Sequence, residues 1–317
     1  SSDLTEVVFA PQERQLIVLR RRLAALGLVE VMNMTFTSPE AVRRTMPGLD
    51  PAAMVRLQNP LSENQSVMRA GLIAGLLETV SLNLRRGTPN VAVFEAGPVY
   101  VQNAGEELPV QGVRLAVALT GAPGGKHWSR PLQPVDFYDA KGFAEAVLEP
   151  YGIVPEYRDA PVAPFAQGQC GAVVVDGQTI GALGTVAADV LKAFDIDQPV
   201  YLLDLDLEPV LGREAPVAAF QTIPRFPPSL RDLAVVVDAA TPAGAVLATA
   251  KDAGGPLLKR VTIFDVYTGK QVPPGKKSVA LSLVFQSDER TLTDADTEGL
   301  REKILAELGK AYQAELR

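Results

Sequence analysis

The sequence contains very little of the residues on which many catalytic and metal sites depend. Its 317 residues include one cysteine, Cys170, and one histidine, His127. A single cysteine excludes an intrachain disulfide and a multi-cysteine zinc site, and a single histidine excludes a zinc site built on several histidines. A Ser-His-Asp triad would have to use His127, which lies in a loop-like segment, and no Gly-x-Ser-x-Gly motif accompanies it. We therefore expect no metal site and a structural or surface role for His127.

Long apolar runs are absent as well. No stretch approaches the roughly 20 apolar residues that cross a bilayer, and the first residues do not resemble a secretory leader. We therefore expect a cytoplasmic protein that does not enter a membrane. The chain opens with Ser1, Ser2 and Asp3 instead of Met, as a fragment or a processed chain would. An apolar content of 47% with 21% charged residues is typical of globular proteins, and the length suffices for two domains.

The net charge of −7 conceals an asymmetry along the chain. Residues 224–317 hold 13 Lys and Arg against 12 Asp and Glu, whereas residues 1–223 hold 17 against 25. A local basic patch between positions 258 and 278 suits contact with phosphates, although a solvated, lysine-rich hairpin explains the same pattern. The patch contains one acidic residue, Asp265, and five basic residues: Lys259, Arg260, Lys270, Lys276 and Lys277.

The first 210 residues predict helices and strands without regular βαβ alternation. Leu16, Leu19, Leu23 and Leu26 predict a helix over 12–26 that stops at Gly27. This order favours an antiparallel sheet flanked by helices. Further strands are expected over 28–36, 91–94, 113–120, 172–175 and 200–207, and further helices after Ser38-Pro39, over 70–86, 142–151 and 186–194.

The remainder of the chain predicts a second, smaller domain. Pattern signals fade from residue 208, and we place a linker at 211–223. Residues 224–317 then read as βαββαβ, which is the order of the ferredoxin-like fold, so the predicted fold class is α+β throughout. Its strands are expected over 231–238, 258–267, 278–286 and 312–316, with a helix over 242–253, a turn through Pro273-Pro274-Gly275 and a long helix capped by Thr293.

Asp265 and Tyr267 are the most informative pair in the sequence. They lie two residues apart on one expected strand, so their side chains share a face. A flat ring beside a lone carboxylate suits an unpaired guanine, because the ring stacks on the base and the carboxylate accepts its Watson–Crick-edge donors. The alternative is a sheet-surface aromatic residue beside a carboxylate at a strand-end turn.

Seven stretches in a fixed order resemble one family, the C-terminal half of the bacterial phenylalanyl-tRNA synthetase β subunit. The resemblance covers essentially the whole chain. The stretches are Asn59-Pro60-Leu61-Ser62 with Met68-Arg69, Phe94-Glu95-Ala96-Gly97, Val135 to Gly142, Gly181-Ala182-Leu183-Gly184, Arg225-Phe226-Pro227 with Arg231-Asp232, Phe264 to Lys270, and Arg290-Thr291-Leu292.

This resemblance implies a class II synthetase-like module over 1–210 and a ferredoxin-fold anticodon-binding domain over 224–317. It implies a partner, the catalytic α subunit, in an (αβ)₂ heterotetramer, and phenylalanine tRNA as a ligand, with no role for DNA. ATP and Mg are expected for the holoenzyme, but no cofactor is expected in this chain. The family's N-terminal domains, which include an editing domain and a magnesium site, do not fit in this chain, so those activities are expected to be absent.

The first module is expected to be catalytically inactive. A working class II core needs arginines against the phosphates of ATP, yet residues 159–212 contain no arginine and only Lys192 as a lysine. Arg69, Arg85 and Arg86 receive no substrate role, since Arg85 and Arg86 suit the helix dipole. The helix over 12–26, flanked by Arg20, Arg21 and Arg22, and the strand over 28–36 match the part of class II cores that builds subunit interfaces, and we expect this face to contact α. A plain core helix is the alternative.

The family's anticodon-binding pattern carries over to Asp265, Tyr267 and Ser278. It implies that Tyr267 stacks on the first anticodon base, a guanine, that Asp265 reads this base, and that the Ser278 hydroxyl bonds the base or the sugar. Lys270, Lys276 and Lys277 are expected to hold phosphates without reading sequence, and Arg231 and Arg290 are further candidate contacts. Two other functions remain open, a free-standing enzyme derived from a class II core and a protein-interaction scaffold.

Overall fold

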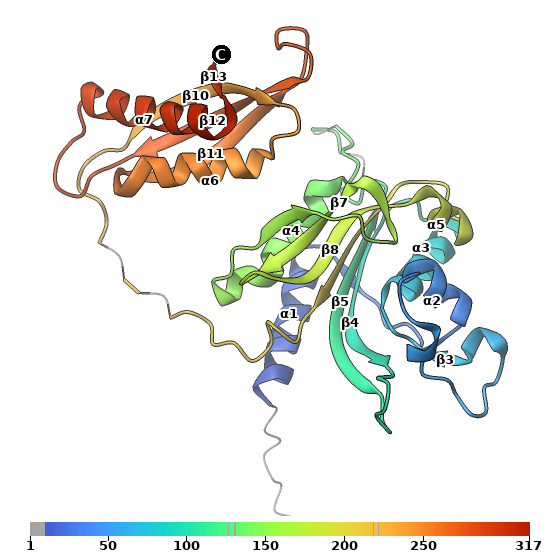
Figure 1. The fold of residues 1–317 in the computed structure, drawn as a ribbon. Helices are drawn as coiled ribbons and strands as arrows, with labels where there is room; N and C mark the ends of the chain where they lie inside the picture. The colour runs from blue at the N-terminus through green and yellow to red at the C-terminus, as the bar shows by residue number, and fades with distance from the viewer. Residues whose placement is uncertain (1–9, 126, 130, 218, 221) are drawn as a thin grey trace, which may run out of the picture. The chain divides into compact units, whose positions relative to one another are not determined.

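The computed structural model describes residues 10–125, 127–129, 131–217, 219–220 and 222–317. The chain divides into two compact units, Ser1–Val217 and Ala218–Arg317, which are described separately (Figure 1). The division falls within the segment 211–223, of which Leu211 is buried in the core of the first unit.

The first unit is built on a seven-stranded sheet with the strand order β1-β4-β5-β9-β8-β7-β6. The short edge strand β1 (Val29–Glu30) runs parallel to β4 (Val91–Val101), and all other neighbours are antiparallel. A separate two-stranded pair joins β2 (Phe36–Thr37) to β3 (Val67–Met68). The other strands are β5 (Val110–Thr120), β6 (Glu156–Asp159), β7 (Phe165–Val175), β8 (Gln178–Val186) and β9 (Val200–Asp206).

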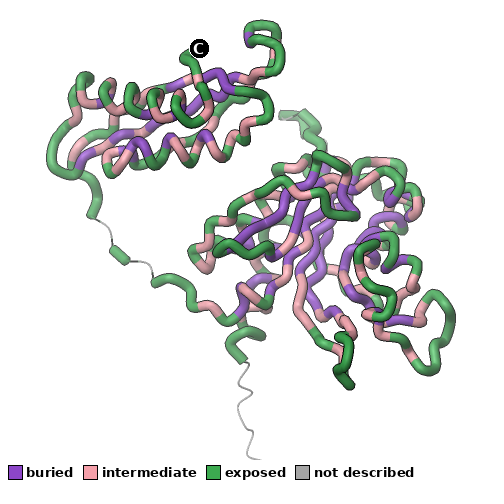
Figure 2. Tube along the Cα trace, viewed as in Figure 1, coloured by how far each residue is buried: buried purple, intermediate pink, exposed green. Residues whose placement is uncertain are grey.

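Helices cover both faces of this sheet, as Figure 1 shows. One face packs against α1 (Pro11–Ala25) and α4 (Phe137–Leu148), and the other against α2 (Pro39–Thr45), α3 (Ile73–Arg85) and α5 (Ala188–Ala193). Successive side chains of a strand point to opposite faces of the sheet, so each central strand contributes to both cores. Along β5, Leu115 and Val117 belong to the α1 core, whereas Ala116 and Ala118 belong to the α3 core. Figure 2 shows the resulting buried stretch through the middle of the sheet.

The predicted helices are confirmed, with shifts at their ends. In α1, Leu19 and Leu23 are buried as expected, but Leu26 lies beyond the helix and is 50% exposed. The stop at Gly27 is confirmed: its φ is +97°, and the next amide, of Leu28, donates to the Leu23 carbonyl as in a Schellman motif. The helix expected over 142–151 begins earlier, at Phe137, because the Asp136 carboxylate caps its first amides.

The strand predicted over 28–36 is wrong. Only Val29–Glu30 pairs with β4, because the chain then turns Asn33 inward, where its Nδ2 donates to Glu95 Oε2 at 2.8 Å.

Several other strands are longer than predicted. In β4, for example, Glu95, Gly97 and Pro98 interrupt the apolar pattern from which a strand is predicted. Strands β6 and β8 were not predicted, and residue 186, expected to begin a helix, instead ends β8.

The second unit confirms the predicted βαββαβ order. Its four strands form an antiparallel sheet in the order β11-β12-β10-β13, and both helices pack on one face over buried residues such as Leu281, Phe285 and Ile304. The last strand is shorter than expected, because α7 continues to Tyr312, whose hydroxyl lies 3.1 Å from Thr249 Oγ1. The elements are β10 (Ser229–Asp238), α6 (Ala243–Gly254), β11 (Leu258–Tyr267), β12 (Lys276–Phe285), α7 (Asp294–Tyr312) and β13 (Glu315–Leu316).

The predicted α+β class is thus confirmed, as an antiparallel sheet module followed by a ferredoxin-like unit. Among the described residues, no helix combines the length and the apolar character that a membrane crossing requires.

Candidate nucleic-acid interface

A β-bulge at Phe264 determines where Asp265 and Tyr267 point. Ile263 lies opposite Leu281 in the core, but after one extra residue Asp265 lies opposite Ala280 and Tyr267 opposite Ser278. Strict alternation from Ile263 would have turned the side chains of Asp265 and Tyr267 toward the helices. The bulge turns them instead to the sheet face that α6 and α7 do not cover, hereafter the second face.

The floor of the second face beside this pair consists mainly of small side chains. Ala280 and Ser278 are followed across the sheet by Ala234 and Val236 of β10. Asp265 itself is exposed and Tyr267 is half-buried. A carboxylate and a ring therefore stand beside a shallow surface that suits a flat ligand.

Ser278, the third residue of the predicted site, lies directly opposite Tyr267 and not opposite Asp265. It is only 2% exposed. The structure thus places Ser278 on the second face but beneath its neighbours, and contact of its hydroxyl with a ligand would require a local rearrangement.

Arg317 and Gly269 lie against the Tyr267 ring, and Gln271 binds Arg317. The guanidinium carbon of Arg317 lies 5.0 Å from the ring centroid, and Arg317 Nη2 donates to Gln271 Oε1 at 2.8 Å. Gly269 lies against the hydroxyl end of the ring, because a Cβ added there would be 2.1 Å from Tyr267 Oη. Sequence reasoning missed all three; the only signal for Arg317 was its place after the expected last strand.

The predicted phosphate-binding lysines are not all on one face. Lys276 lies two residues before Ser278 on β12 and shares the second face, whereas Lys277, paired with Val237, lies on the opposite face. Lys270 is exposed in the connection between β11 and β12. The structure therefore brings Lys276 to the side of Asp265 and Tyr267 and turns Lys277 away.

Arg231 and Arg290, the other predicted contacts, are engaged within the unit. Arg231 pairs with Asp294, and Arg290 donates two hydrogen bonds to Asp296 at 2.7 and 2.9 Å. The Arg290 guanidinium, together with the amide and hydroxyl of Thr293, holds the pKa of the Asp296 carboxyl far below its usual range. Both arginines thus anchor the start of α7.

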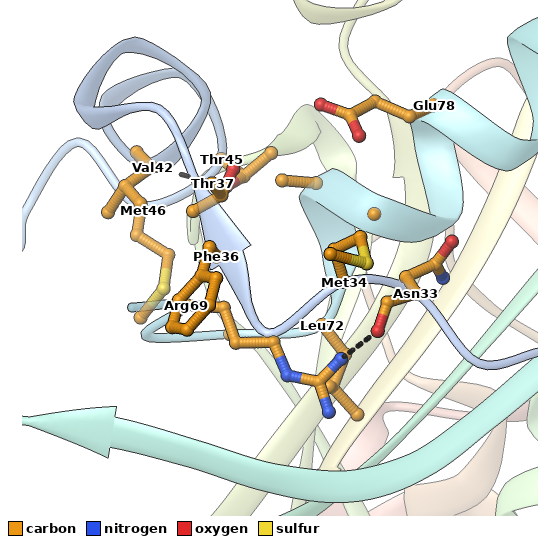
Figure 3. Close-up of a pocket in the computed structure, with 13 residues that line it drawn as sticks. Asn33, Met34, Phe36, Thr37, Val42, Thr45, Met46, Arg69, Leu72 and Glu78 are labelled. Atoms are coloured by element: carbon orange, nitrogen blue, oxygen red, sulfur yellow. Dashed lines mark hydrogen bonds between the residues drawn. The ribbon is translucent and has the colours of Figure 1, made fainter. Parts of the chain in front are cut away.

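In the first unit, Arg69 and Glu95 form a buried ion pair whose side chains are 8% and 4% exposed. Arg69 Nε also donates to the Pro98 carbonyl at 2.9 Å, and Nη1 to that of Asn33 at 3.4 Å. Figure 3 shows Arg69 beneath a small cavity of about 140 Å³. Because Nε and Nη1 already donate to protein acceptors and Glu95 balances the charge, we interpret this guanidinium as a structural cation. The cavity is lined also by Met34, Met46, Leu72 and Glu78, among others.

Arg114 is another arginine of the first unit that a carboxylate engages on the central sheet. From β5 it donates to both carboxylate oxygens of Asp204 on β9, at 3.1 and 2.8 Å. Burial lowers the pKa of Arg114, but the carboxylates of Asp204 and Asp206 more than offset this effect and raise it. Sequence reasoning, which considered residues 159–212, did not take Arg114 into account.

The two rare residues, His127 and Cys170, both lie in the first unit. His127 is exposed, its ring stacks on Trp128, and its Nδ1 lies 2.8 Å from the Ser129 hydroxyl. Cys170 is buried, which raises the pKa of its thiol. The described part of the chain contains no cluster of three or more His, Cys, Asp or Glu side chains that could hold a metal ion.

An exposed apolar surface follows α1 and the edge strand β1. Val18, Val29, Met32 and Met34 are 61%, 62%, 92% and 65% exposed. The polar flank expected beside them is partly neutralised, because Arg20 pairs with Glu30 and Arg22 with Glu149. An edge strand bordered by apolar side chains is typical of a surface that another chain covers.

The fold and the arrangement of these side chains define a class of protein, a two-unit α+β chain whose ferredoxin-like unit carries a ring and a carboxylate on its open sheet face. Residues 3–207 match the family model described as the phenylalanyl tRNA synthetase beta chain CLM domain. Residues 224–317 match the model of the ferredoxin-fold anticodon binding domain. The chain belongs to the phenylalanyl-tRNA synthetase β-chain family.

Curated relatives agree with this assignment. The phenylalanine–tRNA ligase beta subunit of Geobacillus kaustophilus is 37% identical over 301 residues, which cover 94% of this chain and 37% of that protein. The corresponding subunit of Moorella thermoacetica is 38% identical over 313 residues, covering 97% and 39%. The chain thus spans well under half the length of these relatives. Among solved structures, a pyrrolysyl-tRNA synthetase from Desulfitobacterium hafniense superposes with a TM-score of 0.49 at 17% identity, covering 63% of this chain and 68% of its own.

Proposed function

We propose that this chain is a noncatalytic portion of phenylalanine–tRNA ligase, in which the second unit binds the anticodon of phenylalanine tRNA and the first supports the catalytic α subunit. The observation that carries this proposal is the bulge at Phe264, which turns Asp265 and Tyr267 to the second face of a unit that matches an anticodon-binding family. The assembly would be an (αβ)₂ heterotetramer in the cytoplasm, with ATP and Mg used by α.

Tyr267 is the stacking platform in this proposal. Its half-buried ring lies at the end of β11 beside small side chains, with the Arg317 guanidinium over it, so an unpaired base would stack on the part of the ring that Arg317 leaves open. Stacking of a base on an aromatic side chain contributes roughly 1–3 kcal/mol and is largely independent of base identity. Tyr267 therefore supplies affinity more than specificity.

Asp265 supplies the specificity. Its carboxylate accepts hydrogen bonds from N1 and N2 of guanine, a pair of donors that the other three bases do not present in the same arrangement. With a wrong base the carboxylate would be partly desolvated without a partner, which costs roughly 1–3 kcal/mol. Lys270 and Lys276 would add contacts to phosphates, which strengthen binding without reading sequence.

The first unit is assigned to assembly. Its exposed apolar surface at α1 and β1 supports a contact with α, since burial of these side chains would cover an open sheet edge. Arg69 and Arg114, which lie against its central strands, are both engaged by carboxylates. These pairings disfavour an ATP clamp and hence a free-standing enzyme.

The proposal is tested by binding of the 317-residue chain to phenylalanine tRNA at fixed salt. Tyr267→Ala is expected to weaken binding on the order of tenfold or more, because the stacking platform is lost. The control is Tyr138→Ala, which removes an exposed ring from the first unit. If Tyr267→Ala bound as tightly as the unaltered chain, the site assignment would fail and the scaffold function would be favoured.

A second readout separates RNA binding from chemistry. In the complex with α, phenylalanine-dependent pyrophosphate exchange does not involve tRNA, so Tyr267→Ala should leave it unchanged. A large fall in that exchange would show that Tyr267 serves the catalytic assembly and not the anticodon.

A further inference from the structure

Arg317 occupies an unusual position for an exposed arginine. Its backbone amide donates to the Ala234 carbonyl at 3.0 Å, which continues the pairing of β13 with β10 beyond Leu316. Because it lies opposite Ala234, its side chain emerges on the second face, among the small residues beside Asp265 and Tyr267. The strand pairing therefore fixes the position from which the Arg317 side chain extends.

The guanidinium is held by two neutral partners. It lies over the Tyr267 ring, with its carbon 5.0 Å from the centroid, and donates to the Gln271 side chain. Unlike Arg231, Arg290 and Arg301, it forms no ion pair with a carboxylate of the described residues. Its charge is therefore not neutralised locally, and its donors are only partly used.

We infer that Arg317 is an RNA-contacting residue of the same site: it holds the Tyr267 ring in place and donates to a phosphate of the nucleotide that stacks there. This inference rests on the proposed function. An arginine on an aromatic face is weakly hydrated and presents a planar fork that matches phosphate oxygens. A base that stacks beside the ring brings its phosphate within reach of this cation. The neighbouring carboxylate, that of Asp265, is expected to bind the edge of the base and therefore leaves the guanidinium for the phosphate.

The test compares four forms of the 317-residue chain, unaltered, Arg317→Ala, Arg317→Lys and Tyr267→Ala, in binding to a phenylalanine tRNA transcript over a range of salt. Arg317→Ala should weaken binding about three- to tenfold and reduce the slope of log affinity against log salt by about 0.7, the value for one phosphate contact on a single strand. Arg317→Lys keeps the charge, so it should keep the slope and recover part of the affinity.

The outcomes separate this inference from the proposal beneath it. If Tyr267→Ala weakens binding while Arg317→Ala binds equally or more tightly, the guanidinium merely competes with the base, and the role of Arg317 is overturned. A weaker Arg317→Ala with an unchanged salt slope would likewise overturn the phosphate contact. If Tyr267→Ala itself binds normally, the anticodon site falls, and the role of Arg317 falls with it.

Discussion

At the scale of single residues, the position of the Tyr267 ring depends on Gly269. A Cβ at residue 269 would lie 2.1 Å from Tyr267 Oη and 2.3 Å from Cζ, which is closer than real Cβ contacts allow. The ring can lie against this connection only because residue 269 has no side chain. Gly269 therefore helps to set the platform on which we expect a base to stack.

Gly269→Ala should displace the ring and weaken binding of phenylalanine tRNA about three- to tenfold, because part of the stacking contribution is lost. The matched control is Gly244→Ala in α6, where an added Cβ meets nothing within 4 Å. Affinity is measured at one salt concentration for both variants. Equal affinities would mean that the ring adapts without loss and that Gly269 does not position it.

The buried pair of Arg69 and Glu95 makes a second prediction at this scale. Glu95→Gln leaves the Arg69 guanidinium buried without its counter-charge, so it should destabilise the first unit by about 3 kcal/mol. Glu156→Gln removes a carboxylate from an exposed pair with Arg158 and should cost less than about 1 kcal/mol. Chemical denaturation followed by circular dichroism compares the two, and similar losses would contradict a structural role for the buried pair.

Several of the motif residues that carry the family resemblance serve the fold. A Cβ at Gly181 would lie 2.0 Å from the Asp204 carbonyl oxygen, and one at Gly184 would lie 2.2 Å from that of Gln169. Asp136 caps α4, and Arg290 anchors α7. The motif on β11 places Asp265 and Tyr267 on one sheet face, as their spacing predicted, and their proposed role in binding stays a prediction.

At the scale of elements, the β-bulge marks the limit of that prediction. Alternation correctly places Asp265 and Tyr267 on one face, but it cannot say which face, because one extra residue reverses the answer. Arg317 was missed for a related reason. Its role depends on the pairing of β13 with β10, a contact between distant segments that no local pattern encodes.

Failures elsewhere have similar causes. The predicted strand over 28–36 is broken by the inward turn of Asn33 toward Glu95, a tertiary hydrogen bond that overrides β propensity. The ferredoxin-like order, by contrast, was predictable in full, because each of its longer elements carries its own apolar periodicity and turn residues.

The start of α7 carries a pH-dependent prediction. The folded-state pKa of Asp296 is depressed by Arg290 and Thr293, so its stabilising effect is present above its unfolded-state pKa of about 4 and is lost as the pH falls below that value. Asp296→Asn should therefore lower the melting temperature of the second unit at pH 7, and the difference should shrink at more acid pH. Asp252→Asn on α6 is the control. A difference that stays constant as the pH falls below 4 would show that charge is not the cause.

At the scale of the whole molecule, the division of labour between the units can be tested through the surface at α1 and β1. Val29→Glu places a charge at the exposed sheet edge, so it should weaken association with α on the order of tenfold or more, since a buried unpaired charge is costly. Sedimentation of the mixture with α measures the effect. Val154→Glu, at a 90% exposed position outside this surface, should have no effect. Equal association of the two variants would place the α contact elsewhere.

The second unit carries the central claim, that its second face reads the first anticodon base. The most direct test is the affinity of the 317-residue chain for phenylalanine tRNA and for the same transcript with that guanine changed to adenine, at one stated salt concentration. We predict that the chain prefers guanine on the order of tenfold, and that Asp265→Asn abolishes the preference while keeping most of the affinity. Equal binding of the unaltered chain to both transcripts, weakened only by salt, would contradict the claim and leave a basic surface without base readout.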